Sequence, residues 1–185
     1  MKSSYEVRAK RFVEQFFGSI VEDIPNMNSK DFKLYTTYFN HSRSRKVTFK
    51  YGLARYAFIT SDYVVKIDYS AFGVLCYGGC ENEMKAYALA VRDGYEYLFA
   101  KISRYNYKGI NFYIMPRVEG KTCDEEEDAF VYMTEEEQDW CVNNGLSDLH
   151  CNNFKLVNDE PIIFDYASIR GQENNDVEEF LEFEW

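Results

Sequence analysis

The sequence lacks any uninterrupted run of about 18 apolar residues, the length that a membrane-spanning helix requires. Residues 1–10 lead into an amphipathic pattern and do not form the apolar core of a secretory signal. The sequence also lacks a CxxC pair, and its 5 cysteines are an odd number that would leave one unpaired in an oxidising compartment. We therefore expect a cytoplasmic protein with reduced thiols and no membrane partner.

Positive charge is scarce as well. The 21 Lys and Arg residues are outnumbered by 31 Asp and Glu residues, and the formal net charge is -10. Because nucleic-acid affinity comes largely from cationic side chains that displace counterions, this balance opposes direct binding of DNA or RNA. The acidic runs at residues 124–128 and 178–184 are either a solvated surface or a mimic of nucleic acid, and a solvated surface is the commoner of the two.

Aromatic residues, in contrast, are abundant, since 16 Tyr and 15 Phe help to bring the aromatic fraction to 18%. A disordered chain carries far fewer, so we expect one globular domain from these 185 residues. The apolar spacing predicts an α+β fold. Helices are predicted at residues 5–17, 81–92 and 135–144, and strands at residues 47–49, 56–59, 63–67, 97–103, 110–115, 154–157 and 161–164.

The segment most informative about chemistry is residues 145–154. It contains Asp148, which is followed after five residues by Asn153 and after twelve more by Asp165. In this segment the chain resembles the protein-kinase superfamily, whose catalytic loop has the same spacing and whose chain also returns through a strand pair. The Asp-Leu-His-x-x-Asn form is more similar to aminoglycoside-phosphotransferase-like and phage-encoded kinase-like proteins than to eukaryotic kinases.

The resemblance implies an ATP and Mg²⁺ site. Asn153 and Asp165 would hold the magnesium ion, which prefers carboxylate and amide oxygens. Asp148 would be the catalytic residue that orients the acceptor hydroxyl or takes its proton. The alternative is that Asp and Asn side chains in such a tight loop only cap backbone groups.

Upstream residues extend the resemblance. Lys66 lies in an apolar strand segment, where kinases carry the lysine that contacts the α- and β-phosphates. Glu83, with Glu81 as the competing choice, lies on the next predicted helix, where the family places the glutamate that pairs with this lysine. Taken alone, a lysine in a strand is usually an edge residue with its amine in solvent, and a helical glutamate is usually exposed.

Gly52 and Ala54 lie between the first two predicted strands, where kinases cover the phosphates with a glycine-rich loop. Only one glycine is present here, and an ordinary hairpin turn is the alternative. Residues 114–118 correspond in order to the hinge that receives the adenine. The resemblance covers residues 46–167. It depends on several short motifs that are weak individually but occur in the same order as in kinases.

The chain also departs from the family pattern. Leu146 stands where kinases carry a histidine, Ala167 replaces a glycine, and only 20 residues follow Asp165 in a chain of 185. We therefore expect a reduced protein-kinase-like fold with an N-terminal antiparallel sheet, one crossing helix and a truncated helical C-terminal lobe. Within this single domain, residues 1–45 would form a helical extension, residues 46–116 the N-lobe and residues 117–185 the truncated C-lobe.

Two functions remain open at this point. The first is an ATP- and Mg²⁺-dependent phosphotransferase whose acceptor is a protein or a small molecule. The second is a catalytically inactive kinase-like binding module, encoded by a phage, whose acidic and aromatic surface binds a host protein in the host cytoplasm. A missing lobe could also be completed by a second copy of the chain.

Overall fold

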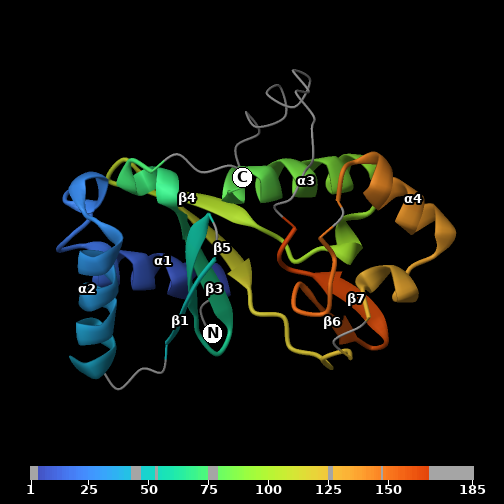
Figure 1. The fold of residues 1–185 in the computed structure, drawn as a ribbon, viewed down its shortest axis with the longest axis horizontal. Helices are drawn as coiled ribbons and strands as arrows, with labels where there is room; N and C mark the ends of the chain where they lie inside the picture. The colour runs from blue at the N-terminus through green and yellow to red at the C-terminus, as the bar shows by residue number, and fades with distance from the viewer. Residues whose placement is uncertain are drawn as a thin grey trace. The chain divides into compact units, whose positions relative to one another are not determined.

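The computed structural model of the chain describes residues 4–42, 47–52, 54–74, 79–124, 127–146 and 148–166 (Figure 1). Its fold is α+β, as predicted, and the described residues include four α-helices and a five-stranded antiparallel sheet. The chain divides into two compact units. The first unit comprises Met1–Cys80 and Ile102–Arg117, and the second comprises Glu81–Lys101 and Val118–Trp185.

The sheet lies in the first unit and has the strand order β1-β2-β3-β5-β4. The predicted antiparallel pairing of the first three strands is confirmed. The last two strands are joined by a tight turn in which Lys108 and Gly109 have φ values of 51° and 87°, the left-handed geometry of hairpin turns. The strands are β1 (Thr48–Tyr51), β2 (Arg55–Ile59), β3 (Tyr63–Asp68), β4 (Ser103–Tyr107) and β5 (Ile110–Pro116).

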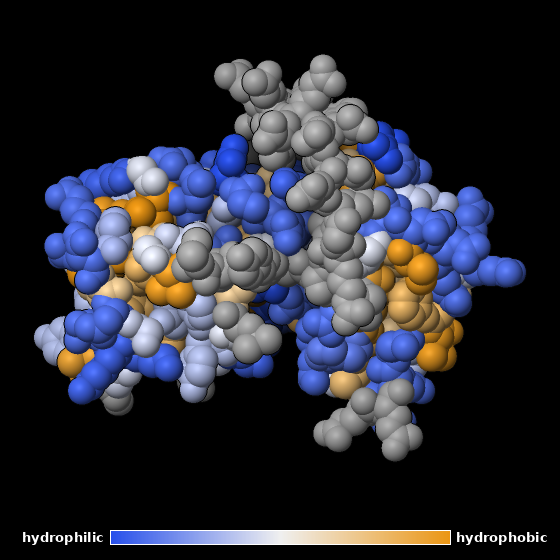
Figure 2. Space-filling view, turned by 45° about the horizontal axis from the view of Figure 1, so that its top comes forward, coloured by the Kyte–Doolittle hydropathy of each residue, from blue (hydrophilic) through white to orange (hydrophobic). Residues whose placement is uncertain are grey.

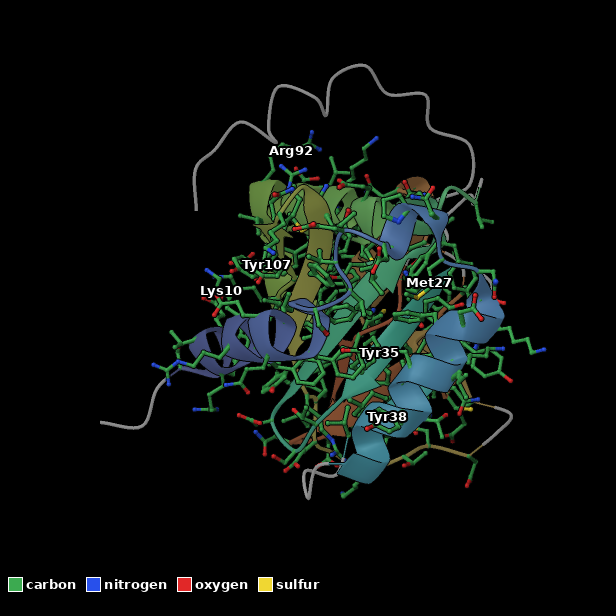
Figure 3. All side chains as sticks on the ribbon, turned by 90° about the vertical axis from the view of Figure 1, so that its left-hand side faces the viewer. Lys10, Met27, Tyr35, Tyr38, Arg92 and Tyr107 are labelled. Atoms are coloured by element: carbon green, nitrogen blue, oxygen red, sulfur yellow. The ribbon has the colours of Figure 1, made fainter. Side chains whose placement is uncertain are left out.

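Two helices of the first unit lie against this sheet (Figure 3). The helix α1 (Tyr5–Phe17) was predicted, and it begins where the Ser4 hydroxyl accepts a hydrogen bond from the Val7 N–H. The second helix, α2 (Ser29–Ser42), lies in the predicted helical extension at residues 1–45 but was not predicted by its own range, because its apolar residues do not form one buried stripe. Phe32 of α2 is fully buried, whereas Leu34 is 70% exposed.

An aromatic core joins these helices to one face of the sheet. Phe58 of β2 is at its centre, with its ring centroid 4.8 Å from that of Phe16, 5.4 Å from that of Phe17 and 6.1 Å from that of Phe32. Figure 3 shows α1 and α2 with Tyr35 between them, and the Tyr35 hydroxyl donates a hydrogen bond to the Phe16 carbonyl. Because side chains alternate along a strand, Phe58 faces this core and its neighbours in β2 face the opposite side.

The second unit contains most of α3 (Cys80–Asp93), all of α4 (Glu135–Asn143) and the hairpin of β6 (Phe154–Val157) and β7 (Glu160–Ile163). The helix α4 begins with a capping box, in which Thr134 and Glu137 each accept a hydrogen bond from the other's backbone N–H. Short 3₁₀ turns complete the structure at Ile24–Asn26, Tyr69–Phe72, Glu96–Leu98 and Ala129–Tyr132.

The turn before α3 requires a glycine. The Asp68 carboxylate accepts a hydrogen bond from the Cys80 N–H at 2.9 Å, which fixes the first residue of the helix. A Cβ atom at Gly79 would lie 2.6 Å from this carboxylate, a distance at which atoms overlap. Gly79 therefore leaves room for the carboxylate that begins the helix, while Gly78 lies outside the described residues.

The predicted strand at residues 97–103 is wrong. Glu96–Leu98 is a 3₁₀ turn instead, and the strand β4 begins only at Ser103. Leu98, Phe99 and Ala100 are all buried. A continuous run of buried residues shows no alternation of apolar and polar side chains, so the sequence pattern does not distinguish a strand from a turn here. None of the helices in the described ranges has the length and apolar content that crossing a membrane requires.

The central position of Phe58 leads to a stability prediction. Replacing Phe58 with Ala should lower the free energy of unfolding by about 3–5 kcal/mol, because it leaves a cavity among several rings. The change can be measured by urea unfolding followed by circular dichroism. Leu34→Ala on the exposed side of α2 is the matched control and should change the free energy by less than about 0.5 kcal/mol. A similar loss in both variants would contradict this account of the core.

Candidate functional site

The loop between α4 and β6 carries the first group of candidate residues. It is closed by Asn153, whose backbone N–H donates to the His150 carbonyl at 2.8 Å. The Asn153 side-chain amide nitrogen donates to the Asp148 carbonyl, also at 2.8 Å. These two bonds hold the loop in one turn and fix the orientation of the Asn153 amide, whose side chain is buried at 8% exposure.

The β6–β7 hairpin then returns the chain to this loop. Asn158 and Asp159 at its tip have φ values of 56° and 66°, which is the type I′ geometry that matches the twist of a two-residue hairpin. At its base, the Asn153 carbonyl accepts hydrogen bonds from the N–H of Phe164 at 2.9 Å and of Asp165 at 3.3 Å. The two predicted metal ligands, Asn153 and Asp165, are therefore joined through their backbones.

Glu83 of α3 lies beside the same segment. Its side chain is fully buried, and its Oε1 accepts a hydrogen bond from the Tyr166 N–H at 3.4 Å. The Tyr166 hydroxyl donates to the Ala100 carbonyl at 3.0 Å, and its ring packs on Phe99 with centroids 5.0 Å apart. The helix is thus connected to the residue after Asp165. Glu81, the competing choice, lies two residues earlier on α3 and is only partly buried.

Asp148 differs from the other predicted site residues of the second unit because it is exposed to solvent. Its side chain is 57% exposed, and one carboxylate oxygen, Oδ1, lies 3.4 Å from Nε2 of His150. Sequence reasoning missed this contact. The signal that could have found it is the two-residue spacing of Asp148 and His150 in a turn closed by Asn153.

The two cysteines near this loop, Cys141 and Cys151, are both buried. His150 is exposed and Cys151 is buried, so their side chains point apart as expected for neighbours in a loop. Burial, and after it the charge of Glu137, raises the pKa of the Cys141 thiol to about 12. The Cys141 thiol is therefore protonated at neutral pH.

The remaining candidate residues belong to the first unit. Lys66 is in β3, where it pairs with Ala57 of β2 and Tyr113 of β5, and it is only 5% exposed. Because its neighbours Val65 and Ile67 belong to the aromatic core, Lys66 points to the opposite face of the sheet.

The loop between β1 and β2 gives less support to a phosphate cover. The Gly52 N–H donates to the Arg55 carbonyl at 3.0 Å, as in an ordinary hairpin turn. A Cβ atom at Gly52 would meet nothing within 4 Å, so neither space nor backbone conformation requires glycine there. The Ala54 carbonyl accepts a hydrogen bond from the Tyr69 N–H at 2.9 Å, and Leu53 lies outside the described residues.

The segment that corresponds in order to the kinase hinge ends the first unit. Ile114 and Met115 are buried in β5. Arg117 is held at both ends, because its N–H donates to the Asp62 carbonyl at 3.1 Å and its guanidinium donates to the Thr60 carbonyl at 2.9 Å. The chain then enters the second unit at Val118.

In the described ranges, no cluster of three or more His, Cys, Asp or Glu side chains could hold a metal ion by itself. Magnesium is usually held by one or two protein groups together with phosphate oxygens and water. Asn153 and Asp165, the two predicted ligands, would form a site of that second type. No protein-family model matches this chain, and no curated protein matches its sequence. The resemblance to kinases therefore depends on these residues and their geometry.

The role of Asn153 in the loop gives a prediction. Asn153→Ala removes the partly buried hydrogen bond to the Asp148 carbonyl and should lower the free energy of unfolding by about 0.5–1.5 kcal/mol, because the bond that closes the loop is lost. Urea unfolding measures the change. The exposed neighbour Asn152 is the matched control, and Asn152→Ala should cost less than about 0.5 kcal/mol. Equal stability of the two variants would show that the loop does not depend on this bond.

Proposed function

We propose that this chain is an ATP- and Mg²⁺-dependent phosphotransferase of minimal kinase-like fold, with a protein or small-molecule acceptor. The observation that carries the proposal is that backbone hydrogen bonds join Asp165 to Asn153, which lies in the same loop as Asp148. In kinases the corresponding asparagine and second aspartate hold the metal ions, and the first aspartate accepts the proton of the substrate hydroxyl. The sequence spacing and the loop geometry thus support the same assignment.

The residues present fit a hard cation. Asn153 uses its amide nitrogen for the Asp148 carbonyl, so its Oδ1 points elsewhere, and no hydrogen bond to Oδ1 occurs among the described residues. An amide oxygen that accepts no hydrogen bond from the protein is well suited to a magnesium ion. Asp165, which is partly exposed, would supply the carboxylate. When bound, magnesium would neutralise the charge of the phosphate oxygens.

The exposure of Asp148 suits its proposed role. A residue that orients an incoming hydroxyl has to be reachable from solvent, and this side chain is the most exposed of the predicted site residues in the second unit. Asn153 fixes the Asp148 carbonyl, which limits the backbone movement of the catalytic residue. The loop therefore holds one residue for the metal ion and one for the acceptor.

The proposal gives the other residues their kinase-like roles. Lys66 lies on the third strand of an antiparallel sheet, and Glu83 lies on the helix that follows this strand in sequence, as the kinase lysine and glutamate do. Lys66 would contact the α- and β-phosphates. Gly52 and Ala54 would cover them from the loop between β1 and β2, where a Cβ atom at Gly52 would meet nothing within 4 Å.

An acidic, aromatic surface on the second unit favours a second candidate, an inactive kinase-like module that binds a protein. The rings of Tyr95 and Trp140 stack with centroids 5.0 Å apart, and Tyr97 is 53% exposed. The hydroxyls of Tyr95 and Tyr97 donate to Glu136 at 3.0 Å and to Glu137 at 2.6 Å. Among the side chains that Figure 2 colours, most are hydrophilic, with smaller apolar areas between them. Such a surface can serve recognition without any chemistry.

The proposed metal site predicts magnesium-dependent nucleotide binding. The native chain should bind ATP in the presence of Mg²⁺, with affinity lower by about tenfold or more when the metal is withheld, since charge-assisted contacts typically contribute 1.5–3 kcal/mol. Asp165→Ala should lose this metal dependence. Isothermal titration calorimetry measures the binding, and release or transfer of the γ-phosphate measures turnover. Binding without turnover would favour the protein-binding module, and a native chain that does not bind ATP would remove the phosphotransferase proposal.

The role of Lys66 predicts a separate effect. Lys66→Ala should weaken ATP binding about 10- to 100-fold, because a charged contact to phosphate is lost. Circular dichroism should show that the variant remains folded. Lys50→Ala is the matched control, since this exposed lysine lies on β1 of the same sheet and should not affect affinity. An unchanged affinity in folded Lys66→Ala would count against the phosphate role.

A further inference from the structure

His150 lies in the loop between Asp148 and Asn153 and is fixed from two sides. Its carbonyl accepts the Asn153 N–H at 2.8 Å, and its ring nitrogen Nδ1 accepts the Asn152 N–H at 3.2 Å. Its backbone also bridges to that of Asp128, next to the bond from the Ala129 N–H to the Leu149 carbonyl at 2.8 Å. An exposed histidine is usually free to rotate, so this degree of fixation needs an explanation.

The bond to Nδ1 determines where the ring proton lies. A neutral imidazole has one N–H and one acceptor nitrogen, and Nδ1 is the acceptor here. The proton is therefore on Nε2. Two groups lie near Nε2, which are the Asn153 amide nitrogen at 3.2 Å and Oδ1 of Asp148 at 3.4 Å. An amide nitrogen cannot accept a proton, so of these two groups only the Asp148 carboxylate is a possible acceptor for the Nε2 proton.

Asp128, whose backbone bridges to that of His150, already has a hydrogen-bond partner for its side chain. The carboxylate of Asp128 accepts the Phe130 N–H at 3.0 Å. Among the described residues, His150 is the side chain within ion-pair distance of the Asp148 carboxylate. A carboxylate that is 57% exposed would otherwise sample several rotamers.

We propose that His150 is a positioning residue, whose Nε2–H orients the Asp148 carboxylate toward the acceptor hydroxyl. This inference depends on the proposed phosphotransferase function. At 3.4 Å the contact is long, and hydrogen bonds around a catalytic group commonly tighten only when substrate is bound. His150 contacts neither the nucleotide nor the acceptor in this role, and it acts through Asp148 alone. Misplacement of a catalytic group by about 1 Å can cost about 100-fold in rate.

The test compares three variants in magnesium-dependent turnover of ATP, with water as the acceptor. His150→Ala should lower kcat about 10- to 100-fold and leave KM for ATP unchanged. His150→Gln should recover most of kcat, because the glutamine amide offers an N–H at nearly the position of Nε2. His41→Ala, which removes the other histidine of the chain from α2 in the first unit, should behave as the native protein does.

The outcomes separate this inference from the proposed function. A native chain that turns over ATP while His150→Ala keeps the native kcat would overturn the role of His150 and leave the phosphotransferase intact. A native chain without turnover would overturn both. A third readout does not use activity: ¹⁵N spectra of the imidazole, recorded well above the usual histidine pKa of about 6.5, should place the proton on Nε2. Asp148→Asn should shift the Nε2 resonance, and a proton found on Nδ1 would reject the inference.

Discussion

The candidate site depends on one carbonyl group. The Asn153 oxygen accepts the N–H groups of Phe164 and Asp165, and these bonds join a loop to a residue twelve positions further along the chain. Three features make this junction between the Asn153 carbonyl and the Phe164 and Asp165 N–H groups possible. The loop is closed by the Asn153 side chain, the hairpin has a turn of the correct hand, and Glu83 accepts the N–H of the residue after Asp165. Without the junction, the amide and the carboxylate would belong to independent segments.

Much of the fold could be predicted from the sequence, where local patterns are strong. The first helix has one apolar stripe, the hairpin of β6 and β7 has Asn158 and Asp159 at its tip, and the capping box marks the start of α4. The α2 helix was missed, because its Phe32 is buried and its Leu34 is exposed by the tertiary arrangement. The strand predicted at residues 97–103 was wrong, because burial of Leu98 to Ala100 comes from packing that no local period reveals.

The same limit applies to the site. The spacing of Asp148, Asn153 and Asp165 indicated a shared loop, and the backbone bonds show that Asn153 and Asp165 meet. The choice between Glu83 and Glu81 required burial, since both lie in the first turn of α3. The role of His150 could not be assigned from the sequence, because it depends on which ring nitrogen accepts a backbone N–H. Metal and nucleotide binding and the kinase-like class remain predictions.

The position of the junction at the base of the hairpin also decides which insertions the chain can tolerate. Cross-strand pairs added at the tip, beyond Val157 and Glu160, would lengthen both arms equally and leave the partners of the Asn153 carbonyl unchanged. A single residue added to one arm would move the register by one and turn alternate side chains to the other face. A change in hairpin length therefore keeps the Asn153 amide and the Asp165 carboxylate together, provided that both strands are lengthened by the same number of residues.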